Sequence, residues 1–314
     1  MDARLESMES FDVRGRHSDY RIVNVGALPG SEAFLLVSDD VAVLYDSGYG
    51  FCGPALVENI GRVLGDRPLD FIFITHSHYD HILGSAHCTR EWPDAKVVAS
   101  RHTSEVIAKD SAKRVMRELD SSAARLHGFS GYEDLTDRLR VDMIVSEGDT
   151  VQAGGFRFVV HEYPGHTFCS IGFHCPDEGL LMSCETLGFY TGEEMTPTYL
   201  VGYRLTLDSI DRALDLDVDV MMLAHSGVVT GHRCRELLEM SRRCAVGMAE
   251  EIIGAHDAGM DFEGILRVLK ARHYTGYARR IQPEAAFDTN ARYMIPMIIR
   301  ELGSERASGP SDDS

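Results

Sequence analysis

Short apolar runs separated by turn residues dominate the first part of the chain. Between Tyr20 and Asp46 they read "YRIVNV", "AFLLVS" and "VAVLYD", with Gly, Pro, Asp and Ser between them, which predicts three strands. The segment "GPALVENIGRVL" (53–64) instead has the apolar spacing of a helix. The β-rich run "LDFIFIT" (69–75) predicts a buried strand, and "AKVVAS" (95–100) predicts another short strand.

Helical spacing follows from about Arg101 to Leu126, and then strands return. The runs that predict them are "DMIVSEGDTV", "FRFVVHEY", "SIGFHC" and "GLLMSC". A helix in "TLDSIDRALDL" and a strand in "DVMMLAH" complete the series. Strands and helices therefore mix through this part of the chain, as in an α/β fold.

After Gly231 the pattern is helical only, up to Leu302. Three segments have amphipathic helical spacing: 233–259, 261–273 and 290–302. We therefore expect four parts. These are a polar N-terminal segment (1–19), a main domain (20–231) with a helical insertion (101–140), a helical C-terminal extension (232–302) and a disordered polar tail (303–314).

Composition and charge narrow the choice of partners. The chain has 49 acidic and 31 basic side chains in 314 residues, for a formal charge of −18, so a nucleic-acid backbone would be repelled by the average field. No apolar run approaches the length of a membrane helix, and the N-terminus lacks the apolar core of a signal peptide. Seven cysteines without a CxxC pair indicate free thiols in a reducing compartment. We expect a soluble, cytoplasmic protein that acts on a small molecule.

The segment "FITHSHYDH" (73–81) concentrates potential metal ligands at the end of a predicted strand. Side chains at i and i+2 of an extended chain point the same way, so His76 and His78 can bind one ion together. Asp80 and His81 follow in the turn, where they can serve a second ion nearby. Imidazole and carboxylate together suit Zn²⁺, Fe²⁺ or Mn²⁺. A metal site therefore explains this cluster better than a lone catalytic base or chance does.

Three more polar residues follow apolar runs and are candidates for the remaining ligands. His166 lies in the Pro-Gly turn of "YPGHT", Glu185 ends "LLMSCET", and His225 ends "MMLAHSG". Strand ends are the positions where an α/β architecture exposes functional side chains.

These motifs, in this order, resemble those of the metallo-β-lactamase superfamily. The resemblance covers roughly 20–231 and implies an αββα sandwich, here with a helical insertion and a helical C-terminal extension. It also implies a dinuclear site, with zinc favoured and iron or manganese as the alternatives. The ligands it implies are His76, His78 and His166 for one ion and Asp80, His81 and His225 for the other.

One ligand departs from the family pattern. Glu185 stands where the family usually has an aspartate that bridges the two ions, and its longer side chain leaves three roles open: bridging, binding one ion, or altering the metal preference. The motif "LYDSGYG" resembles the family's early aspartate-glycine turn and would place Asp46 beneath the metals.

The resemblance further implies a metal-dependent hydrolase in which a metal-bound hydroxide attacks an ester-type substrate, with a thioester or lactone favoured. Asp80 would orient the hydroxide and carry a proton. Tyr190 is a candidate to donate its phenol to the oxyanion, as a nearby tyrosine does in related lactonases; the alternative is a packing role.

A looser resemblance, in layout and a few short matches, connects the chain with the quinolone-signal-response branch, which is associated with thioesterase activity. The helical additions would then shape the substrate pocket, although their apolar faces fit packing against the core or a partner subunit equally well. A homodimer is therefore left open. The alternative functions are a diiron redox enzyme of the same fold and a non-catalytic regulator.

Overall fold

The computed structural model describes residues 8–196, 198–281 and 283–307. The chain divides into two compact units, each built from several stretches of sequence. The first unit comprises Met1–Glu162, Cys169–Cys184 and Asp217–Cys234, and the second comprises Tyr163–Phe168, Glu185–Leu216 and Arg235–Ser314.

A seven-stranded sheet in the first unit follows the chain order β1 to β7. The strands are β1 (Ser10–Arg14), β2 (Asp19–Asn24), β3 (Phe34–Val37), β4 (Ala42–Tyr45), β5 (Phe71–Phe73), β6 (Lys96–Ser100) and β7 (Met143–Val145). Neighbours are antiparallel from β1 to β4 and parallel from β4 to β7. Six of the strands, β2 to β7, lie where the apolar runs predict them. β1 falls inside the polar N-terminal segment, and its side chains are exposed or half-buried, which is why no apolar run marks it.

The second sheet of this unit has six strands in the order β15-β14-β11-β10-β9-β8. They are β8 (Thr150–Ala153), β9 (Phe156–Glu162), β10 (Ile171–Cys175), β11 (Leu180–Met182), β14 (Val220–Leu223) and β15 (Gly227–Thr230). The run "DMIVSEGDTV" forms two strands, β7 and β8, which belong to different sheets. Gly148, at φ 79°, turns the chain between them. β11 and β14 are parallel neighbours, so their carboxyl ends lie at the same edge.

A continuous apolar core fills the space between the two sheets. Phe34, Val43 and Phe73 from the first sheet belong to the same buried cluster as Phe158 and Phe173 from the second. The Phe73 ring stacks on Phe173 with centroids 4.3 Å apart and meets Phe158 edge-on at 5.2 Å. Interdigitated aromatic rings of this kind hold two sheets face to face as a sandwich.

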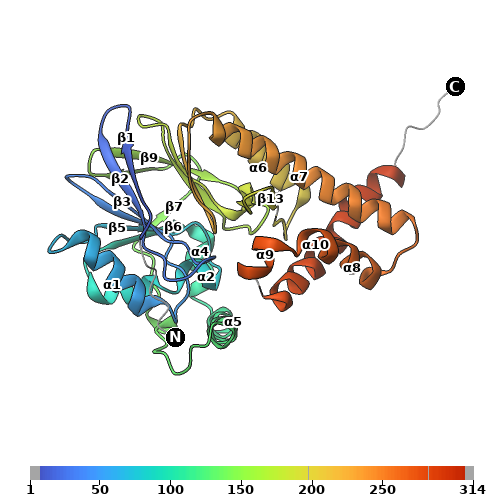
Figure 1. Ribbon diagram of the computed structural model, residues 1–314, viewed down its shortest axis with the longest axis horizontal. Helices are drawn as coiled ribbons and strands as arrows, with labels where there is room; N and C mark the ends of the chain where they lie inside the picture. Colours follow the sequence, from blue (N-terminus) through green and yellow to red (C-terminus); the bar gives the residue numbers. More distant parts are fainter. Residues whose placement is uncertain (1–7, 197, 282, 308–314) are drawn as a thin grey trace. The chain divides into compact units, whose positions relative to one another are not determined.

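The other face of the first sheet is covered by helices. Successive residues of β4 alternate between the two cores: Val43 and Tyr45 face the second sheet, whereas Ala42 and Leu44 belong to the helix-side cluster. Figure 1 shows the helices of this unit gathered on one side of the strands. They are α1 (Gly53–Leu64), α2 (Tyr79–Ile82), α3 (Ser85–Glu91), α4 (Arg101–Ile107), α5 (Asp110–Leu126) and the 3₁₀ turn η1 (Thr136–Arg138). The helix predicted at 53–64 is thus confirmed, and the segment with helical spacing from Arg101 to Leu126 forms α4 and α5.

Asp120, on the buried face of α5, is the main titratable group of this helical layer. It accepts a hydrogen bond from the Gly50 amide (2.9 Å), and burial raises the pKa of its carboxyl to about 6. The folded state therefore retains this proton at a pH where the unfolded chain has released it. The free energy of unfolding must fall as the pH rises through this window, from about 4 to about 6.

Replacing Asp120 with Asn should remove this pH dependence. Between pH 5 and pH 7.5 we expect the wild type to lose about 1 kcal/mol more unfolding free energy than Asp120→Asn does. Urea denaturation of both proteins at the two pH values measures the difference. Equal losses would show that Asp120 titrates normally in the folded state.

In the residues that the structure describes, the second unit is helical apart from one small hairpin. Its elements are the 3₁₀ turn η2 (Glu185–Leu187), β12 (Phe189–Tyr190), β13 (Met195–Thr196), α6 (Tyr203–Leu214), α7 (His232–Asp257, beginning in the first unit), α8 (Phe262–His273), α9 (Gly276–Ile281) and α10 (Glu284–Ala307). The buried side chains of α7, α8 and α10 form one apolar cluster with Tyr199 and Tyr203. Figure 1 shows α8, α9 and α10 beside one another.

Two differences from the expected C-terminal region have a physical basis. The sequence does not predict α9, because its six residues carry little apolar periodicity. The expected tail from Gly303 begins as helix instead, since α10 runs through Gly303 to Ala307. A single glycine costs a helix only about 1 kcal/mol, and Glu305, Arg306 and Ala307 are good helix formers. The rest of that predicted tail, 308–314, lies outside the described residues, as does 1–7 of the predicted N-terminal segment.

Two further predictions concern cysteines and membranes. All seven cysteines are free thiols, as expected. In the part of the chain that the structure describes, no helix combines the length and hydropathy that crossing a bilayer requires.

Candidate metal centre

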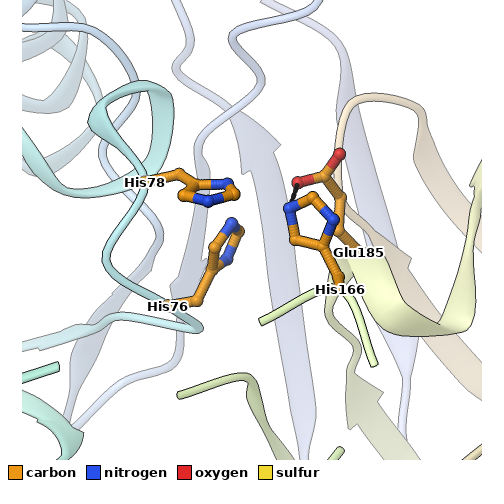
Figure 2. Close-up of side chains that lie close together, drawn as sticks. All are labelled: His76, His78, His166 and Glu185. Atoms are coloured by element: carbon orange, nitrogen blue, oxygen red, sulfur yellow. Dashed lines mark ion pairs between the residues drawn. The ribbon is translucent and has the colours of Figure 1, made fainter. Parts of the chain in front are cut away.

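The segment that carries the densest ligand cluster leaves the sheet at the carboxyl end of β5. Thr75 and His76 are fully buried there, and the chain then turns through His78 into α2. The rings of His76 and His78 lie beside each other (Figure 2), and their centroids are 4.6 Å apart. Asp46 follows β4, the parallel neighbour of β5, so its side chain starts from the same edge of the sheet.

Asp46 organises this edge through three hydrogen bonds. Its carboxylate accepts from the Thr75 amide (2.9 Å), the Thr75 hydroxyl (2.9 Å) and His81 Nδ1 (2.8 Å). Asp46 itself adopts a left-handed backbone conformation, with φ 52°. Aspartate tolerates this conformation better than most residues do, and the three donors hold it there. Asp46 thus lies beneath the histidines, as the sequence predicts.

The same bonds fix which nitrogen of each ring remains available for a ligand. A carboxylate can only accept, so His81 Nδ1 carries the proton and Nε2 presents a lone pair. The Thr75 hydroxyl gives its proton to Asp46, so it must accept from His76 Nδ1, 3.0 Å away. His76 therefore also presents Nε2 as an unprotonated nitrogen when the ring is neutral. Outer partners of this kind are what orient metal-binding histidines.

His225 approaches His81 from the end of β14. Its Nδ1 donates to the Gly30 carbonyl (2.6 Å), which again leaves Nε2 as the basic nitrogen. The Nε2 atoms of His81 and His225 are 3.0 Å apart, and Asp80 Oδ2 lies 4.0 Å from His225 Nε2. His225 has φ 54°, so it and Asp46 are the two non-glycine residues with positive φ in the described chain. Backbone strain is thus concentrated at this site.

The contact between His81 and His225 provides a test of whether these residues suit a metal ion. Two neutral imidazoles cannot point lone pairs at each other across 3.0 Å without strong repulsion. A cation must therefore be shared between them: a proton or a metal ion. Asp80, His81 and His225 each offer one ligand atom, all within 4.8 Å of one another. This set of two imidazoles and a carboxylate fits a divalent ion such as Zn²⁺.

The second unit brings together the other two predicted ligands. His166 Nε2 lies 2.8 Å from Glu185 Oε2, the contact dashed in Figure 2, and both side chains are nearly buried. His166 Nδ1 donates to the Thr198 carbonyl (2.6 Å), and the Thr198 hydroxyl donates to the Glu185 carbonyl (3.1 Å). The basic nitrogen of His166 thus faces a carboxylate oxygen, which again requires a cation.

Tyr190, the predicted oxyanion donor, lies on the small hairpin of this unit. Its hydroxyl donates to the Gly192 carbonyl of the same hairpin (2.5 Å). This bond orients the phenol within its own turn. A catalytic role for Tyr190 stays a prediction.

Three partners that orient the ligands were not expected from the sequence. Thr75 directly precedes His76, and a hydroxyl at the buried end of a strand is a signal that could have identified it. The carbonyls of Gly30 and Thr198 carry no such signal, because any residue supplies a carbonyl. Gly30 lies 195 positions from His225, so only the fold reveals their contact.

Replacing Asp46 with Asn should weaken metal binding without unfolding the site. Asn also tolerates positive φ, but its amide nitrogen cannot accept, so at least one of the three donors loses its partner. We expect metal affinity to fall about 10- to 100-fold. Competition with a chromophoric chelator measures the affinity. The exposed Asp66→Asn variant is the control, and equal affinities in all three proteins would contradict the assigned role of Asp46.

Comparison with known proteins identifies the family of the chain. The family model described as "Metallo-beta-lactamase superfamily" matches residues 28–225, more than half of the chain. The metallo-beta-lactamase fold-containing protein ST1585 of Sulfurisphaera tokodaii is 26% identical over 168 residues, which are 52% of this chain and 62% of that protein. A hydroxyacylglutathione hydrolase of Methylobacterium sp. is 28% identical over 166 residues, 51% of this chain and 52% of that enzyme. The chain thus spans less than two thirds of the length of these curated relatives.

Solved structures show the same fold. A beta-lactamase domain protein from Burkholderia ambifaria superposes with a TM-score of 0.65 at 18% identity, over 95% of this chain and 88% of that one. The structure of ST1585 superposes with a TM-score of 0.56 at 16% identity, over 95% and 100%. The predicted fold class is therefore confirmed. The chain belongs to the metallo-beta-lactamase superfamily.

Proposed function

We propose that the protein is a dinuclear-metal hydrolase of small acyl thioesters. The observation that carries this proposal is the approach of His81 and His225, whose basic nitrogens face each other at 3.0 Å beside Asp80. Such an arrangement is stabilised by a divalent cation. Its donors, imidazole and carboxylate, favour zinc, with iron or manganese as alternatives.

In this proposal His76, His78, His166 and Glu185 hold the second ion. Chain connectivity supports the assignment. Glu185 lies three residues beyond β11 and His225 two residues beyond β14, and these strands are parallel neighbours. His166 lies in the connection from β9 to β10, and the first residue of β10, Ile171, donates its amide to the Thr75 carbonyl beside His76.

The residues of the chain then have distinct tasks. Bound divalent cations would polarise a carbonyl oxygen and lower the pKa of water. Asp46 holds His81, and through Thr75 it holds His76, so that their Nε2 atoms keep their direction. Asp80 is partly exposed beside His225, where its carboxylate can orient a water molecule and accept a proton from it.

The preference for a thioester rests on the relatives. The Methylobacterium protein is by name a hydrolase of hydroxyacylglutathione, whose acyl group is attached to sulfur. A thiolate leaves more easily than an alkoxide, so the expelled group needs no acid from the protein. The proposed mechanism also requires no nucleophilic side chain, because the attacking group is water.

Purified protein loaded with zinc, iron or manganese should be tested on a panel of acyl thioesters and lactones. We expect thiol release from at least one thioester, its loss on chelation, and its return when metal is restored. Lactone hydrolysis without thioester hydrolysis would overturn the thioester preference. No hydrolysis of any member by the metal-loaded protein would overturn the proposed function.

A further inference from the structure

The second unit contains a cavity that the metal centre does not explain. Its volume is about 830 Å³, and it is lined by the hairpin β12–β13 and by α7, α8 and α9. This size falls within the range of pockets that hold small molecules and cofactors. Every residue that lines the cavity belongs to the second unit, so the site is complete within that unit.

Three arginines from three different helices line the cavity: Arg243 from α7, Arg272 from α8 and Arg280 from α9. Arg272 forms an ion pair with Glu251, which also contacts His273 Nε2 at 2.9 Å. Glu251 is the one carboxylate that lines the cavity from a helix, and Arg272 already neutralises its charge.

The other two guanidinium groups have no carboxylate partner among the described residues. Arg280 lies over the ring of Tyr277, 5.5 Å from its centroid, an arrangement that restrains the side chain while leaving its N–H groups available. Arg243 lies one turn before Gly247, which lines the same cavity and offers no side chain to cover it. Arg243 and Arg280 thus line the same cavity without a carboxylate partner among the described residues. They do so in a chain whose formal charge is −18.

The hairpin contributes the opposing charges. Glu193 and Glu194 line the cavity from the exposed turn between β12 and β13. Their charges oppose the binding of an anion, but water screens them at this turn. Glu193 and Glu194 therefore lower the affinity of the cavity for an anion but do not reverse its preference for negative charge.

We propose that this cavity binds a small molecule through a phosphoryl group, with Arg243 and Arg280 as its charged anchors. A guanidinium pairs with phosphate or carboxylate through parallel N–H···O bonds. One carboxylate is planar, carries a single charge and satisfies one such fork. A phosphoryl group carries nearly two charges on oxygens that point in several directions, so it can satisfy two arginines that approach from separate helices.

Calorimetric titration of the metal-loaded full chain with inorganic pyrophosphate, at low ionic strength, tests the proposal. We expect the dissociation constant to rise about tenfold or more in Arg243→Gln/Arg280→Gln, since each lost charged hydrogen bond carries a substantial part of the affinity. Arg279→Gln removes the same charge from the adjacent residue, which does not line the cavity, and should stay within about twofold of the wild type. Glu193→Gln/Glu194→Gln should tighten binding.

Pyrophosphate can also bind metal ions, so a further variant separates the two sites. Binding that persists in His78→Ala but is lost in Arg243→Gln/Arg280→Gln supports the proposal. Binding that is lost in His78→Ala and unchanged in the arginine variant overturns it. Succinate bound as tightly as pyrophosphate would overturn the phosphoryl assignment. Circular dichroism of the arginine variant tests whether it is folded. Titration of each single variant measures how much each arginine contributes to binding.

Discussion

Replacing His81 with Ala should reduce the proposed thioester hydrolysis at least about 100-fold in kcat/KM, a larger effect than the loss of an outer partner causes. The variant should also bind one metal ion fewer per chain. His81 is the residue on which the Asp46 network converges, and its Nε2 faces that of His225 at 3.0 Å. Without the His81 ring, His225 and Asp80 provide too few donors to retain a divalent ion. Elemental analysis of the purified protein and thioester hydrolysis measure the two effects.

A second buried histidine makes a matched control for this prediction. His87 in α3 is 1% exposed, against 2% for His81, and lies outside both ligand groups. Burial lowers the pKa of His87, which favours its neutral ring. Truncation of either ring should cost roughly 2–3 kcal/mol of packing. Only His81→Ala should lose metal and activity per folded molecule, and equal losses in both variants would contradict the ligand role.

The residues that the sequence predicts for the site are those whose chemistry is rare. Histidines concentrated in "THSHYDH" are informative because few structural roles require so many within six positions. Strand ends were predictable for the same reason: an apolar run such as "LDFIFIT" has to be buried, and the polar residues that follow it mark where the chain leaves the sheet. The first unit brings together five of the residues predicted in this way: His76, His78, Asp80, His81 and His225.

The interactions that escaped prediction are contacts between a histidine side chain and a backbone carbonyl distant in the sequence. The Nε2 of His225 is aimed by the carbonyl of Gly30, and that of His166 by the carbonyl of Thr198. A carbonyl has no signature in the sequence, so no pattern distinguishes these two from any others. The hairpin β12–β13 escaped for a different reason, since two-residue strands are too short to show alternation.

Backbone strain adds a link between the fold and the site. Asp46 and His225 adopt positive φ at the ends of β4 and β14, in two different sheets. Each is held by its own side chain, Asp46 through Thr75 and His81, and His225 through Gly30. The hydrogen bonds that orient the ligands thus also retain two strained residues, so loss of one partner affects geometry and stability together.

Glu185 is the ligand at which the resemblance implies a departure from the family pattern, and a series of substitutions should reveal its role. Glu185→Gln preserves length and removes the charge, so we expect metal affinity to fall about 10- to 100-fold and hydrolysis to fall with it. Glu185→Asp preserves the charge and withdraws the carboxylate by about 1.5 Å, one carbon–carbon bond. If Glu185 contacts one ion only, Glu185→Asp should be intermediate. If it bridges two, the aspartate should keep nearly wild-type metal content, because the resemblance implies an aspartate as the bridging residue at this position.

Glu178 supplies the control for this series. It is buried to a similar degree, at 4% exposed against 8% for Glu185, and its carboxylate accepts from the Ser18 hydroxyl (2.7 Å) away from every predicted ligand. Glu178→Gln should lose stability but neither metal nor activity per folded molecule. Metal content and hydrolysis that remain at the wild-type level in Glu185→Gln would show that the Glu185 carboxylate is not needed to hold metal, and its role as a ligand of the proposed centre would have to be abandoned.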